Sequence, residues 1–83
     1  MVQGVLLDVA APSLQQVDSF TIRTNDGQEL HFTVAPNFNQ GVAHQMTPGH
    51  MRQHMALADP IVVTYRTASD GGLVALSAVD VSP

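Results

Sequence analysis

Hydrophobic and polar side chains alternate in two neighbouring stretches of the chain, residues 19–24 and 28–35. A period of two residues is typical of β-strands that bury one face and expose the other. The segment Asn25-Asp26-Gly27 lies between them, and Asp-Gly is a frequent hairpin turn because glycine accepts a positive φ. We therefore expect a β-hairpin whose core-facing residues are Phe20, Ile22, Leu30, Phe32 and Val34.

Three further stretches have the apolar, β-branched composition of strands. In the first, near the N-terminus, Val5, Leu7 and Val9 would share one face of an extended backbone. The other two follow Pro60 and the turn signal Asp70-Gly71-Gly72. The complete set of predicted strands is 4–11, 19–24, 28–35, 61–67 and 73–80.

One helix is predicted between the third and fourth strands, over residues 48–58. Thr47 is suited to cap its N-terminus, and Pro48 fits the first helical position, where no backbone N–H is needed. Pro60 limits the helix, because proline disfavours helical backbone in the residue before it. At helical spacing, the stripe that faces the core would consist of Met51, Met55 and Ala58.

The elements follow one another as strand, strand, strand, helix, strand, strand, within a single domain that spans residues 1–83. This order resembles that of the OB fold, a five-stranded Greek-key barrel with a helix between the third and fourth strands. The resemblance implies an all-β protein with one short helix, and we expect a small bacterial domain. An SH3-like barrel is the alternative, although a helix of this length before the fourth strand counts against it.

The layout is also similar to that of the small periplasmic copper- and silver-binding barrels of bacterial efflux systems. Those barrels hold a monovalent ion with one histidine and two methionines, beside a tryptophan ring. This chain has no tryptophan and no Met-x-Met pair on a predicted strand. No ligand residue is therefore carried over from that family.

The charge of the chain restricts its partners. Seven acidic and three basic residues give a net charge of −4, which disfavours nucleic acids and anionic membranes. OB-type barrels commonly bind oligonucleotides on the outer face of the second and third strands. Here that face would carry Thr21, Arg23, His31 and Thr33, and it has no aromatic ring for base stacking. Weak single-stranded nucleic-acid binding is therefore only a second alternative.

We expect a cytoplasmic monomer or small homo-oligomer without membrane contact, because no apolar run approaches the roughly 18–20 residues of a membrane span and no signal peptide is recognisable.

The segment from His44 to Met55 concentrates side chains that bind metals. It holds three of the four histidines and three of the four methionines, in a chain without cysteine. His50 and His54 are one helical turn apart, so both could reach one ion, and His44 and Met46 could supply further ligands. Thioethers would favour Cu(I), whereas imidazoles alone would favour Zn(II) or Cu(II). Protons compete for imidazole, so binding should weaken as the pH falls through about 6.5.

Core packing also explains the histidines and methionines of this segment and is the preferred interpretation, since methionine commonly fills gaps in a core.

No enzymatic activity is predicted, because the chain has no nucleophile motif or phosphate-binding glycine loop and its aspartates mostly fall at strand ends and turns. The sequence therefore predicts a non-enzymatic binding module for an unknown protein partner, with Cu or Zn binding as the alternative. Candidate residues for an exposed apolar patch are Val62 and Leu73.

Overall fold

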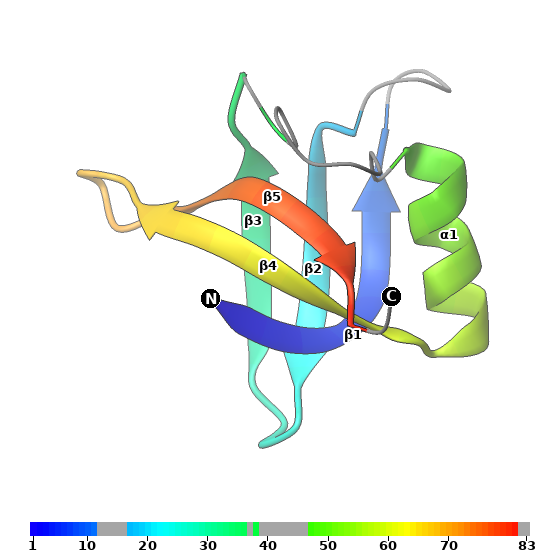
Figure 1. The fold of residues 1–83 in the computed structure, drawn as a ribbon. Coiled ribbons are helices and arrows are strands. Elements are labelled where there is room, and N and C mark those ends of the chain that lie inside the picture. Colours follow the sequence, from blue (N-terminus) through cyan, green and yellow to red (C-terminus); the bar gives the residue numbers. More distant parts are fainter. Residues whose placement is uncertain (12–16, 37, 39–46, 82–83) are drawn as a thin grey trace.

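The five strands of the protein close into a barrel, and the helix packs beside it (Figure 1). The computed structural model describes residues 1–11, 17–36, 38 and 47–81. Its elements are β1 (Val2–Ala10), β2 (Ser19–Thr24), β3 (Glu29–Val34), α1 (Pro48–Leu57), β4 (Pro60–Thr67) and β5 (Leu73–Asp80). The strand order is β1-β2-β3-β5-β4, and β1 pairs with β4 to complete the barrel. The pair β3–β5 is parallel, whereas the other neighbouring strands are antiparallel.

This architecture confirms the predicted fold class, a five-stranded barrel with one short helix between the third and fourth strands. The bounds of β2 and β5 match the prediction, and those of the other elements differ by at most two residues. Both predicted turns are present, since Gly27 and Gly71 have φ angles of 85° and 89°. Glycine adopts this left-handed backbone without the steric cost that a side chain would add.

The hairpin of β2 and β3 supplies the centre of the core. Phe20 and Phe32 lie opposite each other in the register, with ring centroids 5.4 Å apart, and both are buried. Ile22 is also buried, while Leu30 and Val34 are partly buried against the same cluster. The predicted inward face of this hairpin is therefore confirmed.

The prediction that Val5, Leu7 and Val9 share one face of the first strand is wrong. The pairing of β1 with β2 shifts register between Leu6 and Asp8, which is a β-bulge at Leu7. Because of the bulge, Leu6 and Val9 are the buried residues, and Val5 and Leu7 are only half-buried. Gly4 lies on the buried side as well, where a Cβ atom would come within 2.6 Å of the Arg23 carbonyl oxygen.

Helix α1 begins and ends as its flanking residues predict. The Thr47 hydroxyl accepts a hydrogen bond from the His50 amide at 3.2 Å, and Pro48 occupies the first turn. Met51 is fully buried in the barrel core and Met55 packs against it. Ala58 is not part of this stripe, because it adopts a left-handed backbone with φ 55° that ends the helix and leaves it exposed.

The apolar residues proposed for an exposed patch are shielded. Val62 lies in β4 between its neighbours Gln3 and Val79, and Leu73 packs against the core, so both are half-buried. Among the residues that the structure describes, no helix has the length and apolar character needed to cross a membrane.

Candidate metal centre

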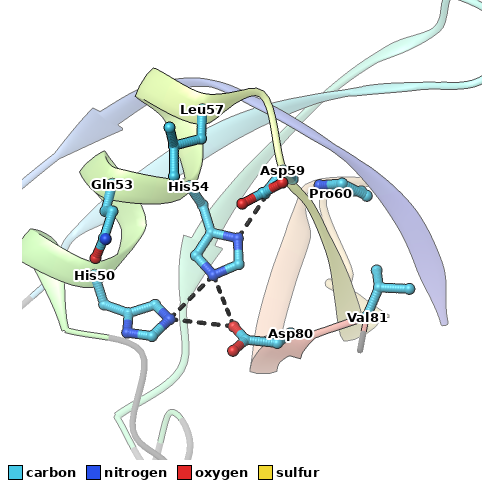
Figure 2. Close-up of a pocket in the computed structure, with 8 residues that line it drawn as sticks. All are labelled: His50, Gln53, His54, Leu57, Asp59, Pro60, Asp80 and Val81. Atoms are coloured by element: carbon cyan, nitrogen blue, oxygen red, sulfur yellow. Dashed lines mark hydrogen bonds and ion pairs between the residues drawn. The ribbon is translucent and has the colours of Figure 1, made fainter. Parts of the chain in front are cut away.

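Two histidine rings of α1 point to the same place beside the end of the barrel (Figure 2). His50 and His54 are one turn apart, and their rings stack with centroids 4.8 Å apart and planes 27° apart. Their Nε2 atoms are separated by 3.0 Å. The helical spacing therefore brings together the two imidazoles that the sequence pairs.

The third member of the cluster is Asp80, the last residue of β5. Its Oδ1 atom lies 3.2 Å from His50 Nε2 and 2.8 Å from His54 Nε2. One oxygen and two nitrogens thus form a small triangle of potential metal ligands, all within 4.8 Å of one another.

The position of Asp80 follows from the chain connection after the helix. Only Ala58 and Asp59 separate the end of α1 from the start of β4. Strand β4 pairs antiparallel with β5, and its residue Ile61 lies opposite Asp80. The end of β5 is therefore held next to the last turn of α1, which contains His54.

A backbone carbonyl favours the tautomer of His54 in which Nε2 faces the cluster with a lone pair. His54 Nδ1 lies 3.4 Å from the carbonyl oxygen of Asp59. A carbonyl oxygen only accepts hydrogen bonds, so Nδ1 is the donor in this contact. In a neutral imidazole the other nitrogen, Nε2, is then an acceptor and suited to bind a metal.

The hydrogen bonds of the triangle cannot all be satisfied by neutral histidines. An ionised carboxylate only accepts, and His54 Nε2 also accepts when Nδ1 carries the proton. The 2.8 Å contact between His54 Nε2 and Asp80 Oδ1 would then join two acceptors. A proton on His54 Nε2, in place of the one on Nδ1 or in addition to it, turns this contact into an attractive one, and so does a cation shared by the three atoms.

The triangle has nearly the dimensions of a metal site. A tetrahedral ion bound at about 2.0–2.1 Å from its ligands separates them by roughly 3.3 Å. The observed separations of 2.8, 3.0 and 3.2 Å need only a few tenths of an ångström of side-chain movement. Shielding differs among the ligands, since the side chain of His54 is 12% exposed and those of His50 and Asp80 are 40% and 44% exposed.

The composition of the cluster indicates which ions suit it. Two imidazole nitrogens and one carboxylate oxygen are typical ligands of Zn(II), and imidazole also suits Cu(II). The two methionines of the helix do not contribute, because Met51 is buried in the core and Met55 packs against it. The preference for Cu(I) expected from thioether ligands therefore has no basis in these methionines.

Of the other predicted site residues, only Arg23 and His31 lie in the described part of the chain, and these two are not part of the cluster. His44 and Met46, the two proposed loop ligands, lie outside the described residues. Arg23 and His31 are exposed on the hairpin, where His31 Nδ1 is 2.9 Å from the Thr21 hydroxyl oxygen. Phe20 and Phe32 of the same strands are buried, so these described residues of the hairpin offer no ring for base stacking.

Sequence reasoning missed Asp80, which was grouped with the aspartates of turns and strand ends. Its position at the end of a strand gave no local signal, because the partner histidines are about thirty residues away in sequence. The informative signal was the short connection between the helix and the fourth strand. Because the fourth and fifth strands pair antiparallel, this short connection brings the end of the fifth strand close to the C-terminus of the helix.

A cavity of about 350 Å³ adjoins the cluster. Its walls come from the C-terminal half of α1, the start of β4 and the end of β5 (Figure 2). Besides the three potential ligands, the lining residues are Gln53, Leu57, Asp59, Pro60 and Val81. The exposed edge of the cluster therefore faces a space of small-molecule size.

Comparison with known protein families, with curated proteins and with solved structures found no match to this chain. The geometry of His50, His54 and Asp80 therefore carries the functional assignment.

Proposed function

We propose that the protein is a small OB-type barrel that binds one divalent transition-metal ion, Zn(II) or Cu(II), through His50 Nε2, His54 Nε2 and an Asp80 carboxylate oxygen. The strand order β1-β2-β3-β5-β4, with the helix between β3 and β4, supports the OB assignment. The convergence of two nitrogens and one oxygen within 2.8–3.2 Å is the observation that carries the metal assignment.

The environment of the cluster supports this function over a purely structural ion pair. The contact between His54 Nδ1 and the Asp59 carbonyl orients the ring so that Nε2 points at the other two ligands. A hydrogen bond from the second ring nitrogen to a carbonyl is the common outer-sphere partner of a metal-binding histidine. An ion pair between a protonated His54 and Asp80 would use the same ring orientation, but it needs no second histidine with its Nε2 atom at 3.0 Å.

The ion would also connect two elements that are far apart in sequence. His50 and His54 belong to α1, and Asp80 ends β5. In a chain without cysteine, an ion at this position would join the helix to the barrel in the way that a disulfide joins two segments. Metal binding is therefore expected to stabilise the fold.

The direct test is a titration of the metal-free protein with Zn(II), and separately with Cu(II), by calorimetry. Stoichiometric zinc should also shift the ring signals of His50 and His54 in NMR spectra, while those of His31 stay in place. Asp80→Asn and His54→Ala should each weaken binding by more than about 100-fold, beyond the effect of losing an outer-sphere partner.

Matched controls separate the site from general histidine or carboxylate binding. His31→Ala removes an exposed histidine on β3, and Asp8→Asn removes an exposed carboxylate on β1. Both variants should bind zinc as the parent protein does. The proposal is wrong if neither ion binds at a stoichiometric excess, or if the control variants lose as much affinity as the cluster variants.

A further inference from the structure

We propose that the bound ion keeps one coordination position open toward the adjoining cavity, and that this position takes the carboxylate of a small aliphatic acid. The inference rests on the metal binding proposed above and adds the class of ligand that the site recruits. Three features carry it: the number of protein ligands, the charge of the site and the apolar side chains around the cavity.

The protein ligands in the described part of the chain leave room for another donor. Tetrahedral metal sites closed by four protein ligands are structural, whereas sites with three protein ligands hold water or a substrate in the fourth position. Among the described residues, the candidate ligand cluster has three members, His50, His54 and Asp80. The same three residues line the cavity, so an additional ligand can approach the ion from that side (Figure 2).

The charge of the site favours a monovalent anion. Two neutral imidazoles and one carboxylate leave a divalent ion with one uncompensated positive charge, which a single carboxylate ligand neutralises. Asp59 also lines the cavity and is exposed. Its negative charge, together with the net charge of −4, repels every anion, and it does so most strongly for ligands with two or more negative charges such as phosphate.

The walls of the cavity favour a ligand with an alkyl chain. Among the described residues, the exposed large hydrophobic side chains are Met1, Leu57 and Val81, and the last two flank this cavity. Leu57 is 63% exposed and Val81 is 41% exposed, so both have apolar surface to cover. Pro60 adds a third apolar contact.

The cavity is large enough to hold a short alkyl chain. Its volume of about 350 Å³ lies near the lower end of the range for small-molecule pockets. A short-chain acid of about four to six carbons fits within this space. Each methylene that is removed from water should strengthen binding about three- to fourfold.

The test uses the zinc-loaded full chain, with acetate, butyrate, butylamine and inorganic phosphate as probes. Binding is followed by NMR through the methyl signals of Leu57 and Val81. Butyrate should shift these signals and bind about tenfold more tightly than acetate, because two additional methylenes are covered. Butylamine and phosphate should bind at least tenfold more weakly than butyrate, and the metal-free protein should not bind butyrate.

A variant tests the apolar contact separately from the metal. Leu57→Ala should leave zinc affinity unchanged and reduce the preference for butyrate over acetate to about threefold. Zinc binding without a butyrate response, or equal butyrate binding with and without zinc, would overturn the ligand assignment alone. Failure of zinc itself to bind would overturn both proposals, and the calorimetric titration distinguishes the two cases.

Discussion

Ile61 near the start of β4 lies opposite Asp80 at the end of β5, and this pairing holds the Asp80 carboxylate beside the two histidines of α1. The relationship depends on barrel register and not on local sequence. The site can therefore form only after the last strand has joined the barrel, so the proposed metal binding would be coupled to complete folding.

Zinc should raise the thermal stability of the protein. A ligand that binds only the folded state, at a free concentration 100 times its Kd, stabilises it by about 2.7 kcal/mol. For a domain of this size that corresponds to a rise in Tm of roughly 10–20 °C. Differential scanning calorimetry with and without zinc measures the rise.

Asp80→Asn should abolish that rise while leaving the metal-free Tm almost unchanged. The Asp80 side chain is 44% exposed, and exposed ion pairs contribute only about 0–1 kcal/mol. A large loss of stability in the metal-free variant would instead indicate that the cluster is a structural ion pair.

Thr47→Ala should destabilise the fold by about 1 kcal/mol, because the Thr47 hydroxyl caps α1 by accepting the His50 amide. The corresponding fall in Tm is about 4–8 °C. Thr47→Ser is the matched control, since serine keeps the accepting oxygen and should retain most of the stability. Equal losses in both variants would contradict a capping role.

Met51→Ala should cost about 2–5 kcal/mol, because Met51 is fully buried and its truncation leaves a cavity in the core. Leu57→Ala on the same helix should change stability by less than about 0.5 kcal/mol, since Leu57 is largely exposed. Chemical denaturation of both variants, with Met51→Leu as a volume-conserving control, tests the assignment. Similar costs at the two positions would contradict the described packing of α1.

The turn between β2 and β3 contains a carboxyl group, Asp26, whose pKa is lowered by hydrogen bonds. The Thr24 hydroxyl donates to the Asp26 carboxylate, and with a backbone hydrogen bond from Gln28 it lowers the pKa of Asp26 below its usual value of 3.8. A lowered pKa in the folded state means that this group contributes stability above the unfolded-state pKa. That contribution is lost as the pH falls through the folded-state value.

NMR titration of the Asp26 side-chain carbonyl measures this pKa directly. Thr24→Val removes the donating hydroxyl while retaining a β-branched side chain, and it should raise the pKa of Asp26 toward 3.8. If the pKa of Asp26 is unchanged in this variant, backbone hydrogen bonds of the turn, and not the Thr24 hydroxyl, cause the lowered pKa.

Much of the fold was predictable because its signals are local. The alternation around Phe20 and Phe32, the positive φ at Gly27 and the cap formed by Thr47 each depend on residues a few positions apart. The bulge at Leu7 was not predictable in this way, because it arises from the fit of β1 to β2 and exchanges the buried face. A regular period of two cannot reveal an inserted residue.

The candidate site likewise has one part that local sequence predicts and one part that depends on strand pairing. His50 and His54 were paired correctly because helical geometry alone places residues four apart on one face. Asp80 was missed because its proximity depends on the pairing of β4 with β5 and on the short connection after Leu57. Ala58 was misassigned to the core because helical spacing was extended into the residue that ends the helix.

The ring of strands also determines how another macromolecule could engage this protein. Every strand is flanked by two others, from β1 beside β2 and β4 to β5 beside β3 and β4. Open sheet edges are where extended peptides add a strand and where β-proteins aggregate edge to edge. The closing pairs are short, with Phe32–Val34 beside Leu73–Ala75 in β3–β5 and Val2–Val5 beside Pro60–Val63 in β1–β4. Along these paired stretches a neighbouring strand closes those routes, so a partner that meets them must recognise outward-facing side chains and not the backbone of an edge strand.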